Sequence, residues 1–168
     1  MKMSKKLLFV LFMATALTSS ITSKAQKGNP LRFGIGINGG STLKDPTQFT
    51  LGADARVQIP LGNSFSAIGT TGYYHFFKNE DKGIPEGVGV VPVKVGLKYF
   101  PVKNVYVAGE AGVGFFTKGD NNTSFVYSPS VGLAFANGLD ISLKYEDFTK
   151  YEGYASQLAL RLAYGFKL

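Results

Sequence analysis

The feature that most constrains this chain is a regular alternation of apolar and polar side chains, repeated in eight segments between residues 31 and 168. Successive side chains point to opposite faces of a β-strand, so a period of two predicts strands with one apolar face. After the N-terminal region the sequence has no convincing helical spacing of apolar residues. The chain is therefore predicted to be all-β.

The eight segments are joined by two kinds of connection. They cover residues 31–38, 49–61, 65–77, 91–99, 105–115, 125–135, 139–146 and 158–168. Most are about as long as the 9 to 11 residues that a tilted strand needs to cross a bilayer. The alternation is weak in the third segment, "FSAIGTTGYYHFF", so its register is left open. Tight turns follow segments two, four and six, including the strong hairpin signal Asn137–Gly138, and longer polar connections follow the others. This asymmetry is typical of an up-and-down barrel with one rim facing the cell exterior.

The first segment, "RFGIGINGG", also matches the G-x-G-x-x-G spacing of a dinucleotide-binding turn at Gly34, Gly36 and Gly39. A nucleotide site requires a helix directly after the glycines. The residues that follow, "STLKDPTQ", are turn-like, so a strand is the favoured interpretation. Gly34 and Gly36 then leave space for side chains such as Arg32 and its partners inside a narrow barrel.

The alternation leaves two orientations open. Apolar side chains line the lumen of a soluble barrel such as a lipocalin, and they face lipid in a membrane barrel. The polar face here combines Gly, Ala and Ser with charges of both signs, and the apolar face carries more large residues than a small cavity could hold. We therefore predict an eight-stranded antiparallel up-and-down transmembrane β-barrel. Its interior charge network is predicted to comprise Arg32, Asp54, Arg56, Lys94, Lys98, Glu110, Asp140, Lys144, Glu146 and Arg161.

Aromatic residues concentrate near the ends of the segments, which predicts two girdles at the membrane interfaces. The long-loop side has Phe49, Tyr73, Tyr74, Phe76, Phe77, Phe115, Phe116, Phe125, Tyr127, Tyr145 and Phe148; the turn side has Phe65, Tyr99, Phe100, Tyr106, Phe135 and Phe166.

Residues 1–25 have the pattern of a cleaved signal peptide, and residues 26–168 are predicted to form the barrel domain. The N-terminal region is basic, residues 7–17 are apolar, and Ser23 and Ala25 occupy the −3 and −1 positions of a cleavage site. Its four lysines leave with it, so the net charge falls from +7 to +3, which gives no argument for nucleic-acid binding. The chain has no cysteine, which excludes a lipoprotein anchor.

In these features the chain resembles the small outer-membrane β-barrels of Gram-negative bacteria, of the OmpA and OmpX general type, and the wider porin-like barrel domain families. The end "QLALRLAYGFKL" is similar to the C-terminal assembly signal of such barrels, carried here by Tyr164, Phe166 and Leu168, although that signal usually ends in an aromatic residue. The resemblance implies a monomer in the cell outer membrane, in contact with lipid and lipopolysaccharide. It also implies that the barrel assembly machinery and periplasmic chaperones handle the chain.

The sequence offers few residues suited to catalysis or metal binding. His75 is the only histidine, and Phe76 and Phe77 follow it, without a hydroxyl at the spacing that barrel enzymes acting on lipid A use. The nearest acids are Glu80 and Asp81. "GDNNT", residues 119–123, lacks the spacing of a calcium loop. We predict no catalytic, cofactor or metal site and a structural or surface-interaction role. Three alternatives stay open: a narrow porin-like channel for small solutes, a secreted lipocalin-like barrel that binds an apolar ligand, and a rim-active lipid enzyme using His75.

Overall fold

The computed structural model describes residues 30–45, 47–78, 87–117, 123–151 and 155–168. The predicted signal peptide, the loop acids Glu80 and Asp81, and residues 119–122 of the "GDNNT" loop lie outside these ranges. The strands are β1 (Arg32–Thr42), β2 (Phe49–Pro60), β3 (Phe65–Phe76), β4 (Val88–Tyr99), β5 (Val105–Phe116), β6 (Thr123–Ala134), β7 (Leu139–Phe148) and β8 (Gln157–Lys167), with a short 3-10 helix, η2 (Thr149–Tyr151), after β7.

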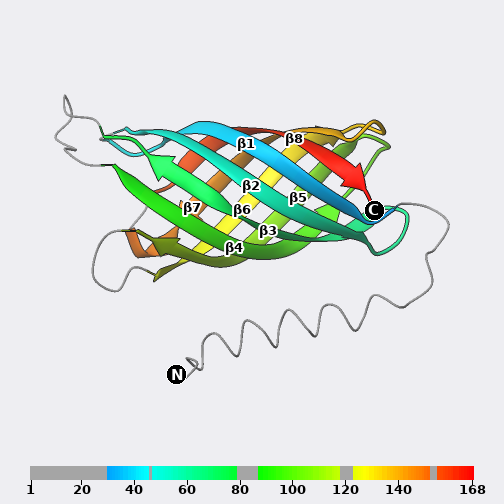
Figure 1. Ribbon diagram of the computed structural model, residues 1–168, viewed down its shortest axis with the longest axis horizontal. Coiled ribbons are helices and arrows are strands. Elements are labelled where there is room, and N and C mark those ends of the chain that lie inside the picture. Colours follow the sequence, from blue (N-terminus) through cyan, green and yellow to red (C-terminus); the bar gives the residue numbers. More distant parts are fainter. Residues whose placement is uncertain (1–29, 46, 79–86, 118–122, 152–154) are drawn as a thin grey trace, which may run out of the picture.

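The strands form one closed barrel in which each strand pairs antiparallel with its neighbour in sequence, and β8 pairs back with β1 (Figure 1). The closing pair runs in register from Arg32 opposite Lys167 to Thr42 opposite Gln157. Closure leaves no strand with an unpaired edge. The predicted eight-stranded antiparallel up-and-down barrel is confirmed.

The two ends of the barrel differ in their connections. Tight turns at residues 61–64, 100–104 and 135–138 lie at the end where β1 begins and β8 finishes, and the amide of Leu168 donates to the carbonyl of Leu31 there over 2.9 Å. We call this the turn end; it carries the C-terminus in Figure 1. The opposite end, with the longer connections, is the loop end.

The turn between β6 and β7 shows how a local signal sets the hairpin. The amide of Gly138 donates to the carbonyl of Phe135 over 3.0 Å, and Gly138 has a φ of 103°. Glycine adopts such a positive φ without the steric cost that a side chain would add. Ala136 and Asn137 therefore form the centre of the turn, and Gly138 leads into β7.

The structure settles the register of the third strand. Ser66, Ile68, Thr70 and Tyr74 of β3 are buried, whereas Tyr73 is exposed. Apolar residues lie on both faces of β3, which explains why the alternation in sequence is weak there.

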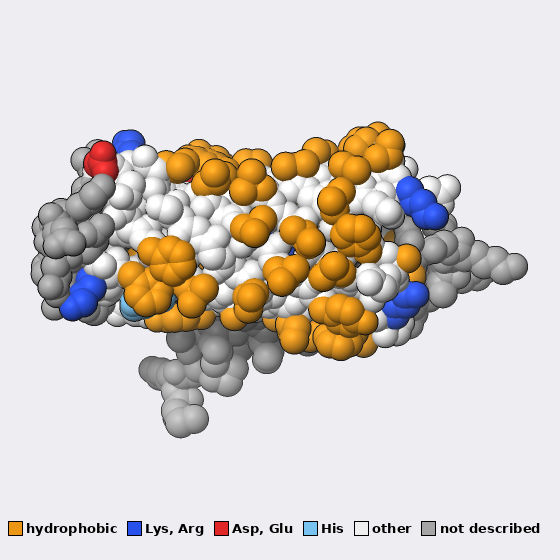
Figure 2. All heavy atoms as spheres, turned by 90° about the horizontal axis from the view of Figure 1, so that it is seen from above, with side chains coloured by type: hydrophobic (Ala, Val, Ile, Leu, Met, Phe, Trp, Pro, Cys, Tyr) orange, Lys and Arg blue, Asp and Glu red, His pale blue; other side chains and the backbone are white. Residues whose placement is uncertain are grey.

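The outer wall of the barrel is apolar. Figure 2 shows hydrophobic side chains spread along the wall and Lys and Arg side chains near the two ends. Val95 is 63% exposed and Leu160 57%, whereas Arg56, Glu110 and Arg161 are buried. This is the burial pattern of a transmembrane barrel and the reverse of the pattern expected for a lipocalin-like soluble barrel. Among the described residues, no helix has the length and apolar character needed to cross a membrane.

Five aromatic residues assigned to the girdles are buried inside the barrel instead, so that part of the girdle prediction is wrong. Tyr74, Phe76, Phe116 and Phe148 point inward near the loop end, and Tyr106 does so nearer the turn end. Each lies at an even position of its strand, in step with the charged inner residues. Proximity to a strand end therefore did not decide their side; the alternation did.

Candidate functional site in the barrel interior

The middle of the lumen is filled by charged side chains from five strands. The alternation places them inward on β2, β4, β5, β7 and β8, and their carboxylates and cations meet across the barrel. We call this set the lumen network: Asp54, Arg56, Lys94, Lys98, Glu110, Asp140, Lys144, Glu146 and Arg161.

One part of the lumen network joins β8 to β2. Arg161 donates to both oxygens of Asp54, from Nε over 2.8 Å to Oδ2 and from Nη2 over 2.5 Å to Oδ1. Asn38 of β1 also donates to Asp54 Oδ2 over 2.7 Å. A two-pronged guanidinium–carboxylate pair fixes geometry as well as charge.

Gly36 explains part of the glycine pattern on β1. A Cβ at this position would lie 3.0 Å from Nη2 of Arg161 and 2.9 Å from the Cβ of Ala163. The expectation that glycine leaves space for a long charged side chain fits this position, although the side chain accommodated is Arg161 and not Arg32. Gly34 is different, because a Cβ at this position would lie 3.3 Å from the backbone carbonyl oxygen of Tyr164 and would meet no charged side chain.

A second part joins β2 to β5. Arg56 donates from Nη2 to Oε2 of Glu110 over 2.8 Å and from Nε to the hydroxyl of Thr70 over 3.0 Å. Within the described residues, Nη1 of Arg56, Oε1 of Glu110 and the hydroxyls of Ser128 and Ser130 are buried without a hydrogen-bond partner.

A third part centres on Glu146 of β7, which is fully buried. One of its oxygens accepts from Lys94 of β4. The other accepts from Gln157 over 2.8 Å and lies 3.4 Å from Nζ of Lys144. Lys144 in turn donates to the hydroxyl of Tyr74 over 2.8 Å.

The fourth part lies toward the turn end. Asp140 accepts from Lys98 over 2.6 Å and from the hydroxyl of Tyr106 over 2.7 Å. The ammonium group of Lys98 lies 3.6 Å from the centre of the Tyr106 ring, so a cation–π contact adds to the ion pair. Arg161 approaches Asp140 at 3.6 Å and links this part to the first.

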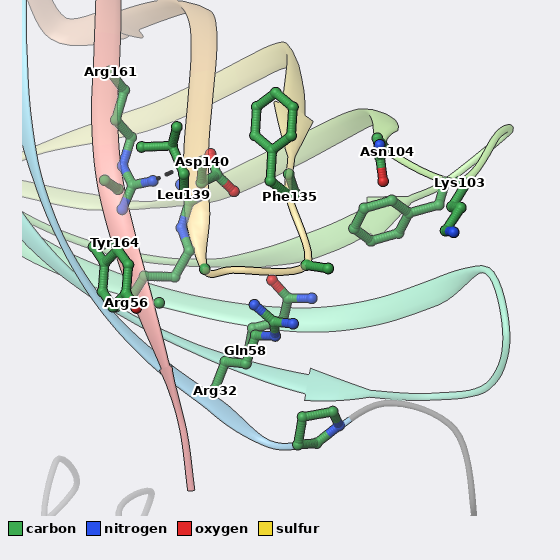
Figure 3. Close-up of a pocket in the computed structure, with 18 of the residues that line it drawn as sticks. Arg32, Arg56, Gln58, Lys103, Asn104, Phe135, Leu139, Asp140, Arg161 and Tyr164 are labelled. Atoms are coloured by element: carbon green, nitrogen blue, oxygen red, sulfur yellow. Dashed lines mark ion pairs between the residues drawn. The ribbon is translucent and has the colours of Figure 1, made fainter.

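Arg32 differs from the other nine predicted network residues. It is half-buried at the turn-end mouth, and no carboxylate within the described ranges pairs with it. There it lines a cavity of about 450 Å³, which we call the turn-end cavity (Figure 3). Proximity to the strand end places Arg32 at the mouth and not in the middle of the lumen.

The loop end of the lumen is closed by an apolar cluster, the loop-end plug: Tyr74, Phe76, Val90, Phe116, Val126, Phe148 and Ala155. Phe148 packs edge-on against Phe116 and Phe76, with ring centres 5.2 and 6.2 Å apart. Each member is at most 8% exposed. Buried apolar side chains therefore lie between the lumen network and the loop end.

His75 lies outside this interior. It is on the outward side of β3, where its Nδ1 is 3.4 Å from the Tyr73 hydroxyl and its ring packs edge-on against Phe77. No group of three or more metal-ligating side chains occurs among the residues that the structure describes. The geometry at His75 is that of an aromatic cluster on the outer wall.

The residues of the predicted assembly signal lie at the turn end of β8. Tyr164 and Phe166 are exposed on the outer wall, with ring centres 5.1 Å apart. Leu168 is also exposed. Whether these residues act as an assembly signal stays a prediction.

The sequence prediction missed the neutral members of the interior. Asn38, Thr70, Tyr74, Tyr106 and Gln157 each complete a hydrogen bond to a charged side chain. Their positions share the alternation of the charged residues, which was the available signal. Nothing in the alternation, however, indicates which charged group each one meets.

Comparison with known proteins supports the fold. No protein-family model matches the chain, and no curated protein matches it in sequence. The outer membrane protein Ail of Yersinia pestis, solved in a phospholipid bilayer nanodisc, matches with a TM-score of 0.53 and 16% identity over 82% of this chain and all of Ail. The de novo designed barrel TMB2.3 matches with a TM-score of 0.53 and 16% identity over 86% of this chain and all of the designed chain. The chain thus has the fold of the small eight-stranded transmembrane barrels, the architecture seen in OmpA- and OmpX-type outer-membrane proteins.

Proposed function

We propose that this chain is an integral outer-membrane barrel with a structural or surface-interaction role, no catalytic site and no conduction path. Its apolar wall contacts lipid, its loop end faces the cell exterior and its turn end faces the periplasm. The protein works as a monomer whose exposed loops contact lipopolysaccharide or other surfaces.

The observation that carries this proposal is the filled lumen. An eight-stranded barrel is only wide enough for its own side chains to fill. Here the lumen network occupies the middle and the loop-end plug covers it. A small-solute channel needs a continuous wet path, and buried aromatic rings at the loop end oppose one.

The surroundings of His75 support the part of this proposal that assigns the chain no catalytic site. Catalysis on the rim requires a nucleophile and a base within hydrogen-bond reach. The hydroxyl that His75 contacts is the phenol of Tyr73, 3.4 Å from its Nδ1, and both residues lie with Phe77 on the outer wall, which this proposal places against lipid. Replacement of His75 by Ala is expected to leave the lipid A profile of expressing cells unchanged, and an altered profile would favour the rim-enzyme alternative.

Fractionation tests the location. We expect the protein in the detergent-extracted outer-membrane fraction, with a faster-migrating band in unheated than in heated gel samples. Its mature mass should correspond to a chain that begins at Gln26. Recovery in the soluble periplasmic fraction would contradict the proposal.

Planar-bilayer recording tests conduction. Protein whose insertion is verified by the heat-dependent gel shift is expected to give no stepwise current. Stable single-channel steps from verified protein would contradict the non-conducting role and favour the porin-like alternative.

A further inference from the structure

The turn-end cavity has the features of a binding site. It opens between the turns at residues 61–64, 100–104 and 135–138 and the start of β1, with a volume of about 450 Å³. We propose that the turn-end cavity binds an oxyanion, a carboxylate or phosphate group on a small molecule or a lipid headgroup. This inference rests on the fold alone and not on the proposed surface role.

The charge of the lining is the first argument. Four cationic side chains, Arg32, Arg56, Lys103 and Arg161, line the cavity together with one carboxylate, Asp140. Asp140 is already neutralised by ion pairs within the lumen network. Figure 3 shows it beside Arg161. Arg161 and Arg56 are likewise paired, with Asp54 and Glu110. The positive charge left without a carboxylate among the described residues is therefore that of Arg32 and Lys103, and it attracts anions.

Arg56 contributes to the wall of the cavity but offers no accessible donor to it. The residue is 7% exposed. Its Nε and Nη2 serve Thr70 and Glu110, while Nη1 is buried without a partner among the described residues. Because Nη1 is out of reach of a solvent-sized atom, the donors that can contact an anion are those of Arg32 and Lys103.

Arg32 and Lys103 supply donors nearer the mouth. The guanidinium of Arg32 lies beside Gln58 (Figure 3), and Lys103 is exposed on the turn between β4 and β5. Neither side chain lies within ion-pair distance of a carboxylate in the part of the chain that the structure describes. Guanidinium groups offer a fork of donors that matches carboxylate and phosphate oxygens.

The walls restrict the ligand further. Phe135 and Leu139 line the cavity alongside the basic groups. Because apolar groups form part of the lining, an oxyanion that carries a short apolar portion fits better than a fully hydrated ion.

Titration in nanodiscs tests the proposal. Isotope-labelled full-length mature protein in zwitterionic phosphatidylcholine nanodiscs is titrated with inorganic phosphate and with acetate, with chloride holding the ionic strength constant. We expect saturable shifts of the amide signals of Asn104 and Gly138 at the cavity and none at Gly89 near the loop end. A parallel sample in phosphatidylglycerol nanodiscs without added phosphate separates the sources: shifts there identify a lipid headgroup, and shifts only with free anion identify a small solute.

Variants decide whether the cavity is responsible. Arg32→Gln should weaken binding roughly tenfold, as expected for loss of a hydrogen bond to a charged group. Lys78→Gln, the matched loss of one positive charge at the loop end, should leave affinity unchanged. Lys103→Gln, which removes the other cation at the mouth, should also weaken binding. The proposal is overturned if no saturable shift occurs in either kind of nanodisc, or if the Arg32 and Lys78 variants bind equally.

Discussion

The buried carboxylate of Glu146 gives the sharpest test of the lumen network. Glu146→Gln keeps the shape of the side chain and can keep the hydrogen bond from Gln157, but it removes the negative charge between Lys94 and Lys144. Lys144 retains the hydroxyl of Tyr74. Lys94 loses its ion pair and stays buried, and breaking a buried pair costs about 3–5 kcal/mol. The second ion pair, to Lys144, is longer at 3.4 Å and Lys144 keeps its other partner, so we expect a loss near the lower end of this range, about 3 kcal/mol of unfolding free energy.

Urea unfolding in lipid vesicles measures this loss, with the unheated gel shift as the readout of folded protein. The double variant Lys94→Met/Glu146→Gln should recover part of it, since the uncompensated ammonium group is gone. Asp45→Asn, a neutralised carboxylate on the exposed loop end, should change stability by less than about 1 kcal/mol. A loss below about 1 kcal/mol for Glu146→Gln would show that the reasoning about buried charges fails in this lumen.

Two further predictions compare matched positions. Gly36→Ala places a methyl group against the guanidinium of Arg161 and should lower the unfolding free energy in urea by about 1–3 kcal/mol. Gly39→Ala, where a Cβ would meet nothing within 4 Å, should be nearly neutral. Equal losses for the two variants would contradict the packing argument. Val95→Arg on the lipid-facing wall should lower the unfolding free energy in vesicles by about 2–4 kcal/mol. Val102→Arg, on the turn between β4 and β5, should change it little. A tolerated arginine at Val95 would place that surface outside the bilayer.

Most of the fold was predictable because one physical rule acts along the whole chain. Residues on opposite faces of a strand meet either lipid or the lumen, so alternation gives orientation and the number of segments gives the barrel. The rule weakens where the lumen itself is apolar. β4 begins at Val88, three residues earlier than predicted, and Val88 packs against the loop-end plug there.

The partners of the charged residues could not be predicted in the same way. Asp54 and Arg161 are 107 positions apart in sequence, and Arg56 and Glu110 are 54 apart. Which inward residues meet across the lumen depends on the tilt and stagger of the strands. Alternation along one strand carries no information on that stagger, so it identifies the members of the lumen network without their pairing.

Arg32 shows why the same alternation leads to two different environments. It shares the inward side of β1 with Asn38, which is buried against Asp54, yet Arg32 lies six residues nearer the turn end and meets the cavity. The interior therefore has a sealed zone beneath the loop-end plug and an accessible zone at the turn end. Among the described residues, Phe116 and Phe148 pack across the lumen toward the loop end, whereas the cavity lies at the turn end. The proposed surface contacts through the loops and the proposed anion binding in the turn-end cavity therefore involve opposite ends of the barrel, and a variant that abolishes one should leave the other intact.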